Sequence, residues 1–267
     1  MKKYLSFFRL RFITGLQYRS AALAGIVTQF AWGFMDIMIF RAFYQAEPES
    51  FPMSLSATAS YIWLQQAFLA FYAAWMFENE IFDCILNGNL AYELCRPADI
   101  YGMWFSRSMA MRMSRAVLRC FPILIIAGFV PYPYGMNAPV DLWHFLLFLV
   151  TLILGLGVTV SCCMLVYVWT FFTISPQGLR MIFVCMVDFF SGAIIPLPFF
   201  PEKMQKIMEC LPFASMQNVA LRIYSGSMTG YQIKKAVLLQ VFWLAAVTAA
   251  GKILCRLAEK RITVQGG

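Results

Sequence analysis

Residues 142–179 read LWHFLLFLVTLILGLGVTVSCCMLVYVWTFFTISPQGL, and this stretch of 38 residues contains no Asp, Glu, Lys or Arg. A helix needs only about 20 apolar residues to cross a bilayer, so the stretch is too long for one ordinary span. The sequence Ser175-Pro176-Gln177-Gly178 is typical of a break, because proline does not fit the interior of a helix. We therefore expect one extended span over 143–170 and another helix over 179–196.

The composition of the whole chain agrees with a membrane location. Of its 267 residues, 61% are hydrophobic and 13% are charged, whereas soluble domains average about 45–50% apolar and about 25% charged residues. Four further apolar runs predict spans over 20–42, 57–77, 116–134 and 235–255. The predicted fold class is all-α: a polytopic membrane protein with about six transmembrane helices in a single domain over residues 1–267.

Three segments depart from the pattern of plain spans. Residues 1–19 combine basic residues with aromatic residues at helical spacing, which predicts an amphipathic helix on the inner membrane surface. Residues 78–115 are rich in charge and predict a cytoplasmic loop. Residues 196–233 are too rich in proline and polar residues for a full span, so we expect a re-entrant or surface helical hairpin on the outer side.

The distribution of Lys and Arg predicts the orientation. With the N-terminus inside and six spans, 15 of the 21 basic residues fall on the inner side, which satisfies the positive-inside rule. The six outer ones are Arg41, Lys203, Lys206, Arg222, Lys234 and Lys235, and the inner ones include the basic tail with Arg256, Lys260 and Arg261. We therefore expect a multi-pass protein of the bacterial cell membrane with both termini in the cytoplasm.

The net charge of +8 raises the question of nucleic-acid binding. The basic residues stand between apolar runs and form no single patch, which favours anionic lipids and no nucleic acid as partner. The sequence contains no GxxxxGK[ST], HExxH or GxSxG motif, so we expect no catalytic residue and no enzyme activity in this chain. Its one histidine and eight cysteines without a CxxC pair predict no metal site.

Two kinds of functional residue remain. Asp36 and Asp188 stand within apolar runs, where a carboxylate is costly, so each is either a lining residue of a translocation path or a helix-packing polar group. The segment 85–97 alternates apolar and polar residues before Pro97 and predicts a short amphipathic helix that projects into the cytoplasm. Such a helix would present apolar side chains with Glu93 and Arg96 as a charged rim.

The chain resembles the permease subunits of bacterial ABC transporters of the ABC-2 type over essentially its whole length. Four features carry the resemblance: the basic N-terminal helix, the inner loop ILNGNLAYELCRPADIY (85–101), the long fourth span with its tight turn, and the hairpin SGAIIPLPFFPEKMQKIMECLPF (191–213). The loop and the hairpin are the more specific of these.

The resemblance implies an exporter built from two permeases and two cytosolic ATPase subunits. The chain itself would need no cofactor, because ATP would be bound by the partner subunit. The inner loop would be the coupling helix, with its ATPase contacts at Asn87, Gly88, Leu90, Tyr92, Glu93, Arg96 and Pro97. The outer hairpin, from Pro196 to about Pro212, would cap the exit, and the second permease would be a copy of this chain or a related one.

Two other classes remain open on the residues alone. An ion- or proton-coupled carrier or channel would use Asp36 and Asp188, and would transport without ATP. A membrane-embedded transferase would need paired carboxylates or a His/Asp cluster at one face, and we find neither in the sequence.

Overall fold

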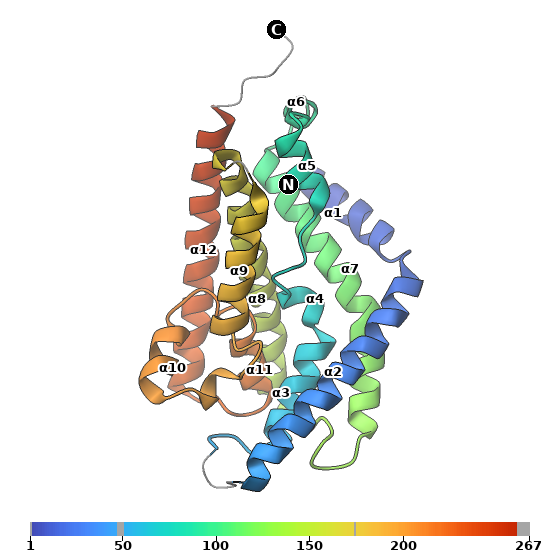
Figure 1. The fold of residues 1–267 in the computed structure, drawn as a ribbon, viewed down its shortest axis with the longest axis vertical. Coiled ribbons are helices and arrows are strands. Elements are labelled where there is room, and N and C mark those ends of the chain that lie inside the picture. The colour runs from blue at the N-terminus through green and yellow to red at the C-terminus, as the bar shows by residue number, and fades with distance from the viewer. Residues whose placement is uncertain (1, 47–50, 174, 261–267) are drawn as a thin grey trace.

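The computed structural model describes residues 2–46, 51–173 and 175–260, and these residues form helices and connecting turns with no strand among them. The helices are arranged as an elongated bundle (Figure 1). In chain order they are α1 (Lys2–Gly15), α2 (Arg19–Ala46), α3 (Leu55–Ala67), α4 (Leu69–Tyr72), α5 (Asn79–Leu86), α6 (Leu90–Leu94), α7 (Ile100–Phe129), α8 (Leu142–Trp169), η1 (Thr170–Phe172), α9 (Pro176–Phe190), η2 (Leu197–Phe199), α10 (Glu202–Glu209), α11 (Asn218–Tyr224) and α12 (Tyr231–Glu259).

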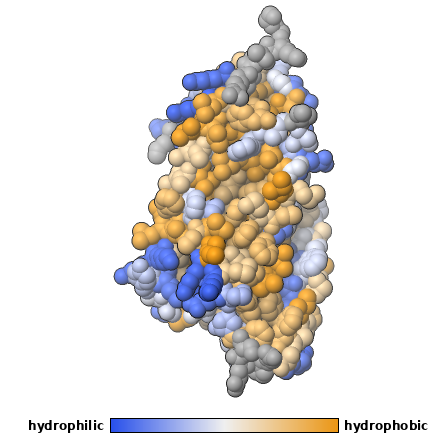
Figure 2. All heavy atoms as spheres, turned by 60° about the vertical axis from the view of Figure 1, so that its left-hand side comes forward, coloured by the Kyte–Doolittle hydropathy of each residue, from blue (hydrophilic) through white to orange (hydrophobic). Residues whose placement is uncertain are grey.

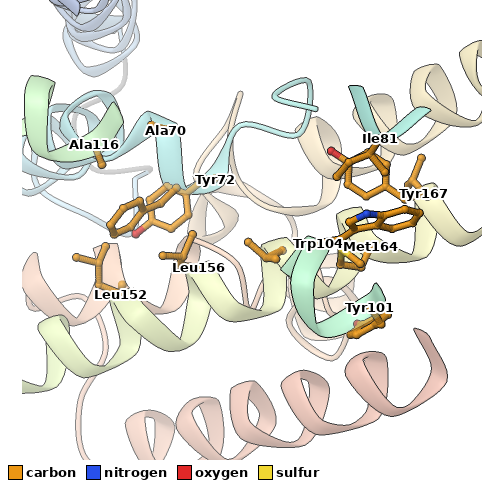
Figure 3. Close-up of a cluster of buried hydrophobic side chains, with 14 of the residues drawn as sticks. Ala70, Tyr72, Ile81, Tyr101, Trp104, Ala116, Leu152, Leu156, Met164 and Tyr167 are labelled. Atoms are coloured by element: carbon orange, nitrogen blue, oxygen red, sulfur yellow. The ribbon is translucent and has the colours of Figure 1, made fainter. Parts of the chain in front are cut away.

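Helix α8 forms the centre of the bundle. Its side chains Leu156, Val160 and Met164 are fully buried, and it packs against α4, α7, α9, α11 and α12. Figure 3 shows α8 running between α12 on one side and α4 on the other. The segment before α11 approaches α8 so closely that a Cβ atom on Gly155 would stand 2.0 Å from the Met216 carbonyl oxygen. Only glycine allows this contact without a shift of the backbone.

The outer surface of the bundle is apolar in the way that a lipid-facing surface requires. Three helical segments within the described residues are long and apolar enough to cross a membrane: Arg19–Ala46, Leu142–Phe172 and Tyr231–Glu259. The first and the last keep most of their side chains on the outside of the bundle. Figure 2 shows apolar atoms over most of the middle of one face, with hydrophilic atoms gathered nearer the two ends.

Several sequence predictions are confirmed. The span predicted over 143–170 is α8, and the break falls where the proline predicts it, with the Ser175 hydroxyl capping α9 and Pro176 in its first turn. The last predicted span lies within α12, and a helix occupies most of residues 1–19. The prolines before α12 do interrupt the chain into short helices, of which α10 and α11 are the longest.

Two predicted boundaries are wrong. The run 57–77 is not one helix: α3 ends at Ala67, α4 ends at Tyr72, and the chain then continues without a helix to α5. The segment 78–115 is not a loop throughout, because α7 begins at Ile100 and runs unbroken into the span predicted over 116–134. The charges of α7 do not end the helix, and Arg107 and Arg112 find partners inside the bundle, as described below. Arg261 of the basic tail lies outside the described residues.

Candidate functional site

A cavity of about 590 Å³ lies between α2, the α3–α4 segment and α9, and we call it the acidic cavity. Asp36 from α2 and Asp188 from α9 both line it, together with Gln29, Gln65 and Gln66. In Figure 1, α3 and α4 lie between α2 and α9, so the two carboxylates come from the two sides of this part of the bundle. The structure therefore brings together two residues that are 152 positions apart in the sequence.

The two carboxylates have no partner of their own. Within the described residues, neither Asp36 nor Asp188 makes a hydrogen bond or a salt bridge, and both side chains are only partly exposed. A helix-packing role would require such a bond to a neighbouring helix. Their position on the wall of a shared cavity fits the other interpretation, a lining role.

The outer end of the acidic cavity is fastened by amide side chains. Gln65 of α3 donates from Nε2 to the Ala193 carbonyl oxygen at 2.6 Å, and Gln217 donates to the Ser191 hydroxyl at 3.3 Å. These bonds tie α3 and the segment before α11 to the turn after α9. The turn that carries the proline-rich hairpin is thus held against the cavity wall.

The second candidate site is a projection at the end of the bundle beside α1, and we call residues 79–97 the arm. Helices α5 and α6 and the turns beside them form it (Figure 1). Gly88 turns the chain between the two helices at a φ of 72°, a conformation that glycine adopts without strain. Tyr92 is 76% exposed at its surface, beside the exposed Leu86 and Leu94.

Six of the seven predicted contact residues share the surface of the arm. Asn87, Gly88, Tyr92, Arg96 and Pro97 are exposed, Glu93 is partly exposed, and the Arg96 and Glu93 side chains form an ion pair at 3.1 Å. Leu90 differs, because only 2% of it is exposed and it packs into the main hydrophobic core. Leu90 therefore anchors the arm and is not available to a partner.

A charged cluster holds the arm to the bundle. The Arg107 guanidinium of α7 pairs with both Glu78 and Glu80, and its hydrogen bond lowers the pKa of the Glu80 carboxyl below the ordinary value. On the opposite side, Arg180 of α9 donates to the Asn79 side chain at 3.2 Å. These contacts connect the arm to two of the long helices directly.

Helix α1 braces the other end of the arm. The Lys3 ammonium donates to the Pro97 carbonyl oxygen at 2.5 Å, and the Tyr4 hydroxyl accepts a hydrogen bond from the Asp99 backbone N–H at 3.2 Å. The Asp99 carboxylate caps α7 by accepting from the Gly102 backbone N–H at 2.8 Å. A displacement of the arm would therefore be transmitted to α1 and α7 together.

Arg112 is a structural residue whose role the sequence analysis missed. Its side chain is fully buried, and its guanidinium donates to four backbone carbonyls where the chain leaves α4: Ala70, Phe71, Ala73 and Met76, at 3.0–3.2 Å. The guanidinium replaces helix hydrogen bonds that this irregular segment cannot make. The spacing of Arg112, Arg115 and Arg119 was the available signal, since it places three arginines on one helical face.

At the opposite end, the hairpin is closed by one buried ion pair. Arg222 of α11 lies 2.5 Å from the Glu209 carboxylate of α10, and it donates as well to the Ser227 carbonyl oxygen. All seven residues of α11 are buried. The hairpin predicted over 196–233 therefore contains a mostly exposed helix, α10, and a buried helix, α11. The Arg222–Glu209 ion pair joins the two helices.

Comparison with models of known protein families identifies the family of this chain. The family model described as "ABC-2 family transporter protein" matches residues 30–266, which is most of the chain. No individual curated protein matches it. The match covers α3 to α12 and most of α2, including the arm, the acidic cavity and the hairpin. With its all-helical bundle and membrane-length helices, this chain belongs to the ABC-2 family of transporter membrane proteins.

Proposed function

We propose that this chain is the transmembrane subunit of an ATP-driven exporter, in which it forms half of the translocation path and couples to a separate cytosolic ATPase. Membership of the ABC-2 family supports the general assignment. The observation that carries the coupling role is the arm, which exposes Tyr92 between Leu86 and Leu94 and is fastened at its base by Arg107. Exposed aromatic side chains of this kind are frequent hot spots of protein interfaces.

The proposed topology follows from the same arrangement. The chain crosses the membrane with α2, the α3–α4 pair, α7, α8, α9 and α12, and the arm, α1 and the C-terminus face the cytoplasm of a bacterial cell. The hairpin with α10 then lies outside and caps the exit. A path for a substrate needs more wall than one such bundle provides, so a second copy or a related permease completes it.

Movement of the arm is the proposed coupling step. Closure of a nucleotide-bound ATPase pair would push on Tyr92 and the Glu93–Arg96 pair. The base of the arm would pass the displacement to α7 and α9, which bear on it through Arg107 and Arg180. Because packed helices move as bodies, the bundle would tilt between two arrangements.

The test is a co-purification of the chain with its cytosolic ATPase partner, with two matched pairs of variants. Tyr92→Ala removes the exposed aromatic residue of the arm, and Tyr132→Ala removes one that is 80% exposed elsewhere. Arg96→Glu reverses one charge of an exposed ion pair in the arm, and Lys206→Glu does the same in α10.

The two arm variants should lower ATPase retention by about tenfold, which corresponds to a loss of about 1.4 kcal/mol. Tyr132→Ala and Lys206→Glu should leave retention unchanged. Equal retention by all four variants would show that the arm is not the docking surface.

One observation supports a second candidate function. Asp36 and Asp188 line one cavity without partners among the described residues, which is also what a proton- or ion-coupled carrier would need. Such a carrier would transport in ATP-depleted vesicles under a pH gradient. Transport that requires ATP and survives collapse of the gradient would exclude it.

A further inference from the structure

We propose that the acidic cavity binds an organic cation with an apolar body, and that amphiphilic cations are the substrate class of this transporter. The inference rests on the proposed function for its transport step, but the binding step concerns this chain alone. It follows from three properties of the cavity: unpaired negative charge, unsatisfied acceptor atoms and aromatic walls.

The first property is the unpaired negative charge of the acidic cavity. Asp36 and Asp188 carry two carboxylates, and no Lys or Arg lines the cavity beside them. Elsewhere in the described bundle, Arg222 is paired with Glu209 and Arg107 with Glu78 and Glu80, whereas these two carboxylates have no charged partner. Charge–charge attraction strengthens as the surroundings lose water. A positive group entering this cavity would therefore be attracted by both carboxylates.

The second property is a pair of unused polar atoms. The Gln29 side chain is 4% exposed and the Tyr72 side chain is 3% exposed, and both line the cavity. The Gln29 Oε1 atom and the Tyr72 hydroxyl have no hydrogen-bond partner among the described residues. A buried polar atom without a partner costs free energy, so its presence on a cavity wall indicates a ligand that completes it. The Gln29 oxygen can only accept, which again favours a positively polarised ligand.

The third property is the size and aromatic lining of the cavity, which favour an organic cation over a bare inorganic ion as its ligand. The volume of about 590 Å³ lies within the range of small-molecule sites, which is about 300–1,000 Å³, and far exceeds one ion. Trp32 and Trp75 line the cavity with Leu69 and Ile194. Aromatic faces attract organic cations through cation–π interactions. Nowhere in the described residues do three or more His, Cys, Asp or Glu side chains gather as a metal site would require.

The experiment measures saturable binding to the full chain in lipid nanodiscs, with empty nanodiscs as background. The probe is tetraphenylphosphonium, a cation with an apolar body, and the matched probe is tetraphenylborate, an anion of the same shape. The test variant is the double substitution Asp36→Asn with Asp188→Asn, which removes both charges and keeps the side-chain size. The matched control is Asp141→Asn, because Asp141 lies outside the cavity, where Asn can also cap α8.

Wild type and Asp141→Asn should bind tetraphenylphosphonium saturably, and the double variant should bind it at least about tenfold more weakly. Tetraphenylborate should show no saturable binding. Elution of each variant as wild type in size-exclusion chromatography establishes that it is folded, and each single Asp→Asn variant serves if the double variant is not. Wild-type affinity in a folded variant, saturable binding of tetraphenylborate, or no saturable cation binding by wild type would each overturn the inference. Failure of the proposed ATPase coupling would leave this binding unchanged, so the two proposals can fail separately.

Discussion

Arg112 and Asp36 are both ionisable side chains among the long helices, yet their surroundings are opposite. The Arg112 guanidinium donates to four backbone carbonyls and contacts the Cys163 sulfur at 3.3 Å. The Asp36 carboxylate has no bond to any described residue, although a buried charge without a partner is costly. A buried charge that donates hydrogen bonds to several backbone carbonyls stabilises the fold. A charge that has no partner in the fold is available to a ligand that binds and dissociates.

The comparison extends to the whole molecule. The side of the bundle around α7 and α8 contains the central core and the ion pairs of Arg107, and it carries the arm. The side between α2 and α9 contains the acidic cavity, with Asp36 and Asp188 unpaired. We infer a division between a part that transmits movement and a part that receives the substrate, and the following variants test it from the largest effect to the smallest.

Loss of the Arg112 side chain should have the largest effect. Arg112→Met leaves four carbonyls without their donor, so the free energy of unfolding should fall by about 3–5 kcal/mol. The control is Arg119→Met, two turns further along α7, because the Arg119 side chain makes no hydrogen bond within the described residues. Thermal unfolding in detergent measures both, and a loss within about 1 kcal/mol for Arg112→Met would contradict its structural role.

Loss of Arg107 should loosen the arm without unfolding the bundle. Arg107→Gln removes the partner of Glu78, which is largely buried, so opening of residues 79–97 should become easier by about 2 kcal/mol. Hydrogen exchange should therefore speed up in α5 and α6 and stay the same in α8. Lys206→Gln breaks an exposed ion pair and should leave exchange in α5 and α6 unchanged. Unchanged exchange in α5 would show that Arg107 does not hold the arm.

Removal of the cavity charges should have the smallest effect on stability. Asp36→Asn and Asp188→Asn break no hydrogen bond within the described residues, so unfolding should shift by less than about 1 kcal/mol, or in the stabilising direction. Thermal unfolding measures the shift beside that of Arg112→Met. A loss of about 3 kcal/mol would mean that these carboxylates hold the fold together, and the contrast with Arg112 would not stand.

The topology can be tested by labelling cysteines that the chain already has. Cys95 is exposed on the arm and Cys210 is exposed after α10, at the opposite end of the bundle. With intact cells, a membrane-impermeant maleimide should label Cys210, and it should label Cys95 only after permeabilisation. Single-cysteine versions of the chain assign the signal to each residue. Labelling of Cys95 from outside would invert the proposed orientation.

The sequence predicts the helices that depend on local rules. The uncharged run gives α8, and the Ser175-Pro176 pair gives both the break and the cap of α9. Hydropathy fails at α7, because Arg107 and Arg112 read as loop residues when their partners are unknown. Those partners, Glu78 and the carbonyls after α4, lie about 30 to 40 residues away in the chain. The amino-acid composition of a segment does not show which distant residues its side chains contact.

The candidate sites likewise contain some features that the sequence predicts and others that only the structure shows. Spacing and polarity predict the exposed face of the arm, including Tyr92 and the Glu93–Arg96 pair. The resemblance to ABC-2 permeases implies Leu90 as a contact residue, whereas its apolar side chain packs into the core. Asp36 and Asp188 can be identified one at a time as costly residues. Only the packing of α2 against the α3–α4 segment and α9 places them in one cavity.

The central claim is that this chain moves an organic cation through the acidic cavity when a partner hydrolyses ATP. The most direct measurement is uptake of tetraphenylphosphonium into inverted membrane vesicles that contain the chain and its ATPase, with and without ATP. We predict ATP-dependent uptake that persists without a pH gradient and falls at least about tenfold when Asp36 and Asp188 are both replaced by Asn. Uptake by the folded double variant at the wild-type rate, or uptake driven by a pH gradient without ATP, would contradict the account.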